Sequence, residues 1–312
     1  MKPETLNKKF RANGKLYIAG EYTVLDGGLS FAIPTKLGQT LEVKYEEESD
    51  SPQLIWEAFL EDGSLWFSAE FEMKTLSILK SSDAKLASRL FEILQAIETL
   101  NLTFFLNQTQ NIHCKTQLEF PKDWGLGSSS TLIYLLAQFS GVDEFELNNL
   151  TFKTSGYDVA CASRNHPILY QLKDGKRRIE SLRFQPEFKD DLYFVYLNKK
   201  QDTQISVSQT YASKTKNEGL VAEISGLVEK IIQAETLEEF EKLIDRHETL
   251  LSEHLGLPKV KDLYFSDYTG SVKSLGAWGG DFVLVTGREG LLAYFSSRGY
   301  HSVLSYNDLE IC

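Results

Sequence analysis

The chain has 312 residues, which is long for one compact core and predicts two domains. Hydrophobic residues make up 42% and charged residues 25%, a globular composition that excludes disordered and collagen-like chains. The formal net charge of −11 argues against a nucleic-acid partner, because a broad binding face for phosphates needs clustered lysine and arginine.

The first half of the chain predicts a mixture of sheet and helix. A turn signal, Asp26-Gly27-Gly28, interrupts the β-rich opening. Residues 87–100 repeat apolar side chains at three- and four-residue intervals, which is typical of a helix. Strand-like patterns occur at residues 16–22, 41–45, 75–80, 102–107 and 113–120.

The rest of the chain predicts further helices and strands. A buried helix follows a polar turn and ends at Gly141. Residues 190–200 read as a strand, and residues 219–234 and 237–255 as two helices. Residues 272–287 read as a Gly-rich turn leading into a buried strand, and residues 289–307 as a helix and a last strand. We place the domains at residues 1–185 and 186–312.

The cysteines and the N-terminus indicate the compartment. Cys114, Cys161 and Cys312 are odd in number and widely spaced, so they indicate neither a disulfide framework nor a zinc site, and a reducing compartment suits them. No signal-peptide pattern follows the N-terminus, and no stretch reaches the roughly 18 apolar residues of a membrane span. We predict a cytoplasmic protein with no membrane partner.

The strongest local motif is PKDWGLGSSST at residues 121–131. Its glycines let the backbone turn tightly enough for several amides to point at one anion, and the helix that follows adds its positive end. These features predict a phosphate site. The alternative is an ordinary helix N-cap, a position that serine and threonine favour. No GKS or GKT closes the loop, so it is not a Walker A motif.

Two further motifs carry charged candidates. Lys15 follows Gly14 in a strand-like run, where its ammonium group is expected either to point into a cleft or to lie in water at a strand edge. Asp158, in Ser155-Gly156-Tyr157-Asp158, is expected either to cap the helix that follows or to orient a reacting hydroxyl.

A fourth motif, residues 276–281, reads GAWGGD and precedes a buried strand. Its glycines would let the backbone approach a ligand closely, and a tight turn explains them equally well.

The order and separation of these four motifs resemble the GHMP kinase superfamily, which includes galactokinases and homoserine, mevalonate and phosphomevalonate kinases. The likeness spans nearly the whole chain and is strongest toward phosphomevalonate kinases, through GEY at residues 20–22 and SGYDVA at residues 155–160. Mevalonate kinases come next, typically with histidine where Tyr22 stands. Asn13 in place of a proline and Trp278 in place of a glycine depart from the family pattern.

The resemblance implies a role for each motif. Lys15 would stabilise charge on the transferring phosphoryl group, and Asp158 would act as base or orienter for the acceptor hydroxyl. Ser129 would bind magnesium, while Glu146 is only a weak candidate for a second magnesium ligand. The ATP phosphates would contact Gly125, Leu126, Gly127, Ser128, Ser129 and Ser130. The acceptor would contact Glu21, Tyr22, Lys200, Thr203, Gly276, Ala277 and Gly279.

The implied fold is α+β, the two-domain GHMP kinase fold, with an N-terminal ribosomal-protein-S5-domain-2-like domain and a C-terminal ferredoxin-like α/β sandwich domain. The implied function is ATP- and Mg2+-dependent phosphorylation of a small acidic metabolite, with mevalonate or phosphomevalonate favoured. The alternatives are a sugar or amino-acid kinase and a nucleotide-binding protein without catalysis. The sequence leaves a homodimer open.

Overall fold

The computed structural model describes residues 7–199, 211 and 215–311. The chain forms two compact units that alternate along the sequence. Unit 1 holds the described residues up to Gly14 together with 37–122 and 127–163, and unit 2 holds 15–36, 123–126 and the described residues from 164 onward. Compact units and inherited domains are different divisions of a chain, so the boundary after residue 185 stays a prediction.

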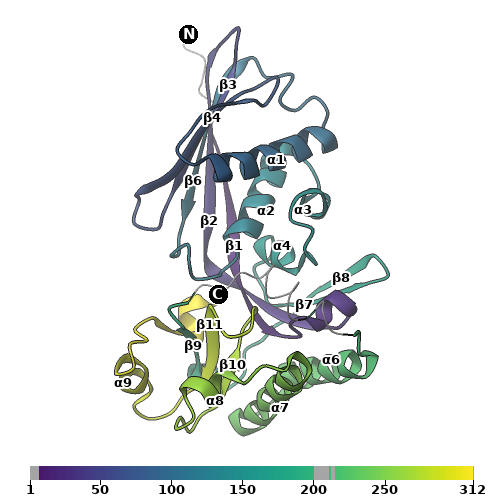
Figure 1. Ribbon diagram of the computed structural model, residues 1–312, viewed down its shortest axis with the longest axis vertical. Coiled ribbons are helices and arrows are strands. Elements are labelled where there is room, and N and C mark those ends of the chain that lie inside the picture. The colour runs from purple at the N-terminus through teal and green to yellow at the C-terminus, as the bar shows by residue number, and fades with distance from the viewer. Residues whose placement is uncertain (1–6, 200–210, 212–214, 312) are drawn as a thin grey trace. The chain divides into compact units, whose positions relative to one another are not determined.

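Unit 1 is a sheet covered by helices on one face (Figure 1). Its strands alternate buried and half-buried side chains, as β3 does throughout, because one face packs on the core. Strands β3 and β6 are parallel, whereas the pairs β2–β6, β3–β4 and β4–β5 are antiparallel. The order is β5-β4-β3-β6-β2, with β1 on β2. The strands are β1 (Asn7–Ala19), β2 (Ser30–Glu48), β3 (Gln53–Phe59), β4 (Leu65–Glu72), β5 (Ile78–Ser81) and β6 (Gln110–Leu118).

Helix α1 of unit 1 buries one apolar stripe, whereas α2 and α4 are buried around most of their surface. In α1, Asp83 caps the first turn by accepting from two backbone amides, and Leu90, Ile93, Leu94 and Ile97 then recur on the buried face. They pack with residues of the sheet in a single core. The helices are α1 (Ala84–Leu100), α2 (Ser128–Ser140), α3 (Glu144–Thr151) and α4 (Tyr157–Ala162).

Unit 2 contains a four-stranded antiparallel sheet in the order β10-β11-β9-β12. Its strand β11 is buried along its whole length, which explains the unbroken apolar run FVLVT. The strands of this sheet are β9 (Leu192–Tyr196), β10 (Val272–Ser274), β11 (Phe282–Thr286) and β12 (Val303–Ser305). A hairpin, β7 (Ile168–Lys173) and β8 (Lys176–Ser181), pairs with the start of β2.

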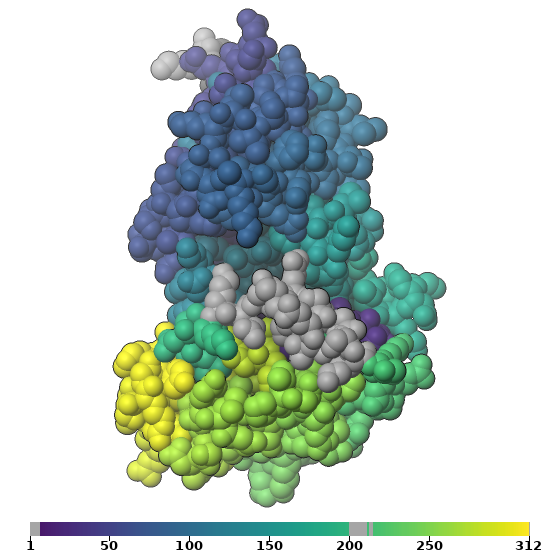
Figure 2. Space-filling view, in the orientation of Figure 1, coloured from purple at the N-terminus to yellow at the C-terminus, as the bar shows by residue number. Residues whose placement is uncertain are grey.

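The helices of unit 2 include a long pair that lies side by side (Figure 1). Residues of α7 and α8 form a continuous stretch of the surface of this unit (Figure 2). The helices are η1 (Thr23–Asp26), η2 (Lys189–Asp191), α6 (Glu218–Gln233), α7 (Leu237–Leu255), α8 (Val260–Tyr264), α9 (Leu291–Ser296) and α10 (Tyr306–Leu309). Within the described ranges, every helix is too short or too polar to cross a bilayer.

One predicted strand is wrong. Residues 102–107 form turns after α1, with Phe105 buried and Leu102 72% exposed. The segment has strand-like composition, but it has no alternation of buried and exposed side chains that would fit one face of a sheet.

Candidate functional site

Three of the four motifs line one pocket in unit 2. Lys15 comes from β1, Gly125 from the predicted phosphate loop, and Gly276 and Asp281 from the C-terminal glycine motif. These segments are far apart in the sequence, so only the fold brings them together. The remaining lining residues are Leu16, Tyr17, Trp124, Leu275 and Phe282.

Residues 123–126 are held in place from two sides. The Lys15 amide donates to the Leu126 carbonyl at 2.9 Å. On the other side, the ring of Trp124 meets Phe282 edge-on at 5.4 Å, and the Tyr196 hydroxyl donates to the Asp123 carbonyl at 3.0 Å. The loop therefore enters the pocket in a fixed conformation.

Gly125 is the one residue of this loop that no other amino acid can replace without strain. Its φ is +68°, and a Cβ atom would lie 2.3 Å from Oδ2 of Asp281. The carboxylate of Asp281 thus packs directly against the loop backbone. Asp281 itself has a positive φ, +51°.

Helix α2 begins without a side-chain cap. Its N-cap is Gly127, with φ +91°, and no side chain accepts from the first-turn amides. The Ser130 hydroxyl donates to the Gly127 carbonyl at 2.8 Å, whereas Ser129 is exposed. The ordinary N-cap explanation of the serines is therefore wrong, and the amides at this helix start are suited to an anion.

Ser128 and Ser129 also line a second pocket, which lies within unit 1. The pocket encloses about 700 Å³, counted to its opening into solvent, and is mostly apolar. Its walls come from the sheet and from α1 and α2, and include Trp56, Trp66, Leu86, Arg89 and Phe152. The guanidinium of Arg89 lies 4.2 Å from the centre of the Phe152 ring. A flat aromatic ligand with a charged tail would match such walls.

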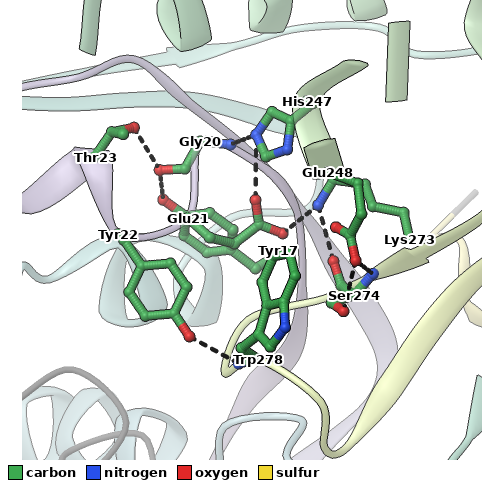
Figure 3. Close-up of polar contacts among 10 residues, drawn as sticks. All are labelled: Tyr17, Gly20, Glu21, Tyr22, Thr23, His247, Glu248, Lys273, Ser274 and Trp278. Carbon is green, nitrogen blue, oxygen red and sulfur yellow. Dashed lines mark hydrogen bonds and ion pairs between the residues drawn. The ribbon is translucent and has the colours of Figure 1, made fainter. Parts of the chain in front are cut away.

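The predicted acceptor residues Glu21 and Tyr22 lie in a strained turn. Tyr22 has φ +62° and ψ −52°, and the Thr23 amide donates to the Glu21 carbonyl at 2.6 Å, which closes a three-residue turn. Both side chains are buried. The carboxylate of Glu21 points toward His247 and Lys273 (Figure 3).

The glycine motif contacts this turn directly. The Trp278 amide donates to the Tyr22 hydroxyl at 2.8 Å, and the indole N–H of Trp278 donates to the Pro258 carbonyl at 3.0 Å. The indole is buried and is not part of the pocket wall. Gly276 and Gly279 have φ near +70°, at +70° and +74°, and Ala277 between them is buried.

Asp158 lies in the first turn of α4, half-buried, and is not its N-cap. The N-cap is Gly156, with no side-chain cap, so the predicted capping role is wrong. This result leaves the catalytic role as the open prediction for Asp158.

The magnesium prediction is supported by single residues only. Ser129 and Glu146 are both exposed in unit 1, and the Glu146 carboxylate accepts from the Asn149 amide at 3.5 Å. Within the part of the chain that the structure describes, no three His, Cys, Asp or Glu side chains gather to hold a metal. The residues present would fit a cation only together with ligands supplied by nucleotide phosphates.

Two predicted acceptor contacts, Lys200 and Thr203, lie outside the described residues. Their neighbour Lys199 is exposed, and its carbonyl accepts from the Asp281 amide at 2.8 Å. The predicted roles of these residues stay predictions.

Sequence reasoning missed four residues around the unit 2 pocket and the turn. Lys273 precedes the glycine motif, Asp281 is the last residue of that motif, and His247 and Glu248 lie inside an amphipathic helix. Lys273 gave only a weak signal, because the short strand VKS around it also contains a serine, although a buried ammonium needs an anionic partner. His247 and Glu248 had no comparable signal.

Comparisons with known proteins bear on the fold. No protein-family model matches the sequence, and no curated protein matches it. Solved structures match nearly the whole chain. A Lin0012 protein from Listeria innocua has 19% identity, covers 96% of this chain and 97% of its own, and gives a TM-score of 0.69.

Two kinases match over a similar extent. Phosphomevalonate kinase from Streptococcus pneumoniae, in complex with phosphomevalonate and AMPPNP, has 17% identity, a TM-score of 0.66, and coverage of 97% of this chain and 98% of its own. Galactokinase from Lactococcus lactis, complexed with galactose, has 14% identity, a TM-score of 0.65, and coverage of 98% and 93%. The chain therefore has the α+β, two-domain GHMP kinase fold that its motifs predicted.

Proposed function

We propose that the chain is an ATP- and Mg2+-dependent small-molecule kinase of the GHMP type. The observation that carries the proposal is the unit 2 pocket, where Lys15, Gly125 and Gly276 from three distant motifs line one wall. A chain that shared only the fold would not need to bring these particular residues together.

Unit 1 would supply the nucleotide site. The apolar pocket would take the base, since Ser128 and Ser129 on its wall lie at the start of α2. The phosphates would then meet the uncapped amides of this helix and the backbone from Gly125 to Ser130. Magnesium, held by Ser129 and the phosphates, would neutralise part of their charge.

The transfer would form a bond between the acceptor oxygen and the γ-phosphorus and break the bond to ADP. Lys15 would donate hydrogen bonds to the phosphoryl oxygens as charge develops on them. Where the acceptor is a hydroxyl, its proton would pass to Asp158. Where the acceptor is a phosphate, no proton need be removed, and Asp158 would not be needed as a base.

Mevalonate or phosphomevalonate is the acceptor class that we favour. The support is the resemblance of residues 20–22 and 155–160 to phosphomevalonate kinases, together with the structural match to an enzyme solved with phosphomevalonate. A sugar or amino-acid kinase is the second candidate, because galactokinase matches the fold to a similar degree.

A nucleotide-binding protein without catalysis is the third candidate. Its main support in the sequence was the bulky Trp278 in the glycine motif. The structure weakens that support, because the Trp278 indole donates to the Pro258 carbonyl and does not line the pocket, whereas Gly276 does.

The test is ADP release by the purified protein with magnesium and ATP. The acceptors are mevalonate, phosphomevalonate, galactose and homoserine, beside a control without acceptor. Strong stimulation by one acceptor supports the kinase proposal and identifies the substrate. ATP binding without stimulation by any of them would favour the non-catalytic candidate.

A further inference from the structure

Lys273 is a fully buried cation between two predicted acceptor segments. Its Nζ lies 2.6 Å from Oε1 of Glu21 and 2.8 Å from the Ser274 carbonyl oxygen, and its exposure is 0% (Figure 3). An ammonium group without water must be paired, so Lys273 ties β10 to the Glu21 turn.

Helix α7 contributes three further hydrogen bonds around the Glu21 turn and Ser274. His247 accepts from the Gly20 amide through Nε2 at 2.9 Å, which puts its proton on Nδ1. Burial, with the charge of Lys273, holds the pKa of His247 well below its ordinary value, so the ring is neutral. Glu248 accepts from both the amide and the hydroxyl of Ser274, at 3.0 and 2.8 Å.

The charges of the cluster balance with one ionised carboxylate. Burial raises the pKa of Glu21, and Lys273 opposes this rise through its charge and hydrogen bond. Burial also raises the pKa of Glu248, to about 7. The short contact to Lys273 makes Glu21 the ionised partner, and Glu248 holds its proton at pH values below about 7.

The cluster connects the two predicted acceptor segments. Glu21 and Tyr22 form the strained turn, and Lys273 precedes the glycine motif by three residues. A direct hydrogen bond, from the Trp278 amide to the Tyr22 hydroxyl, also joins the two segments. A turn with a strained φ persists only where surrounding contacts determine it.

We propose that Lys273 is a positioning residue for the transfer reaction, which holds the Glu21–Tyr22 turn against the glycine motif so that both segments face the acceptor. This inference rests on the proposed function. Stability alone gives no reason for the pair, because a well-packed apolar pair of similar volume is often as stable as a buried ion pair. What the ion pair adds is a fixed register between a strained turn and a glycine-rich segment.

The test compares Lys273→Met with Lys273→Arg and with Lys242→Met. Lys242 forms an exposed ion pair with Glu238 on α7, so it is a matched control for the loss of a lysine. For Lys273→Met we expect kcat/KM for the acceptor to fall at least tenfold while KM for ATP stays within twofold. Lys273→Arg keeps the charge and should lose less. Lys242→Met should behave as the wild type.

A second measurement needs no acceptor. With 5-fluorotryptophan in the four tryptophan positions, fluorine NMR reports each indole separately, and Trp278→Phe assigns the relevant signal. In Lys273→Met we expect the Trp278 signal to shift or broaden, while the signals of Trp56 and Trp66 in unit 1 stay in place. If Lys273→Met fails to fold, Lys273→Arg carries both measurements.

The outcomes separate the two proposals. If the wild type turns over no acceptor, the proposed function fails and the positioning role falls with it. If the wild type is active and Lys273→Met keeps its acceptor kcat/KM, or if ATP and acceptor kinetics decline equally, the positioning role alone is overturned.

Discussion

Lys15 and Asp158 are the two side chains on which the proposed chemistry depends. Lys15 is half-buried on the wall of the unit 2 pocket, and Asp158 is half-buried in the first turn of α4. We expect Lys15→Ala and Asp158→Ala each to lower kcat by roughly 10²–10⁴-fold, because positioned charge and proton transfer contribute on that scale. Steady-state ADP release measures the loss.

Thermal melting of the same preparations supplies the control. Neither side chain belongs to a hydrophobic core cluster, so the melting temperatures should stay within a few degrees of the wild type. Full activity in both variants would contradict the mechanism, whereas a large fall in melting temperature would show that the residues act through folding.

Glu248 gives the stability of the protein a specific pH dependence. Its pKa in the folded state, about 7, lies above the ordinary 4.5, so between these values the native state binds a proton that the unfolded chain does not. The free energy of unfolding should therefore fall as pH rises from about 5 to 7, by on the order of 3 kcal/mol from this group.

Urea unfolding at pH 5, 6, 7 and 8 measures this dependence. Glu248→Gln cannot titrate and should show a shallower decline than the wild type. Glu253→Gln, at an exposed position on the same helix, should keep the wild-type profile. Equal slopes in all three proteins would mean that Glu248 is ionised throughout.

The sequence predicted the residues whose type was itself unusual. Lys15, Gly125 and Gly276 each had an ordinary explanation and were named because the order of their motifs resembles a kinase family, and all three line one pocket. His247 and Glu248 could not be named from the sequence, because polar residues are common on the exposed face of an amphipathic helix. Only the fold shows that these two side chains are buried.

At the scale of elements, the loop from residue 123 to 126 depends on Gly125. Gly125→Ala would place Cβ 2.3 Å from Asp281 and strain a φ of +68°. Gly175 has φ +71° and no atom within 4 Å of such a Cβ, so Gly175→Ala carries the strain without the collision. We expect Gly125→Ala to lose at least tenfold in kcat/KM and Gly175→Ala to keep its activity in the same assay. If both variants lost activity to a similar extent, backbone strain would explain the loss without the collision with Asp281.

The pocket between α1, α2 and the sheet makes a prediction about ATP. Leu86 lines it, so Leu86→Trp should fill space that the base would occupy and weaken ATP binding at least tenfold. Leu102→Trp adds the same side chain at a position that is 72% exposed and should leave binding unchanged. Calorimetric titration with AMPPNP measures the affinity of both variants. Equal affinities would show that the nucleotide does not bind in this pocket.

Element prediction succeeded where periodicity was strong. Helices α1, α6 and α7 follow apolar repeats of three and four residues over several turns. Residues 102–107 failed because a short aromatic run satisfies a strand pattern as well as a turn that buries one ring. The strands β3 and β4 had no prediction, although they pair with each other across a short turn and alternate buried and half-buried side chains.

At the scale of the whole molecule, the two proposed ligands should protect different units. Hydrogen exchange with AMPPNP alone should slow at α1, β4 and the start of α2, which surround the unit 1 pocket. Addition of the acceptor should slow exchange at residues 20–22 and 276–279, whereas Lys15 would face the phosphoryl group and should respond to the nucleotide. Protection of the second set by the nucleotide alone would contradict the assignment of acceptor contacts to those residues.

The alternation of the two units along the chain has a consequence during synthesis. The Glu21 carboxylate cannot form its ion pair until Lys273 is synthesised, 252 residues later. At ordinary rates of translation this delay is roughly 10–50 s. Throughout that interval the first segment of unit 2 is outside the ribosome without the helix and strand that bury it. Unit 1 can complete its core once residue 163 has emerged, whereas unit 2 can close only near the end of translation. A nascent chain stalled before Lys273 should therefore hold a folded unit 1 beside an opening segment that still requires protection from aggregation.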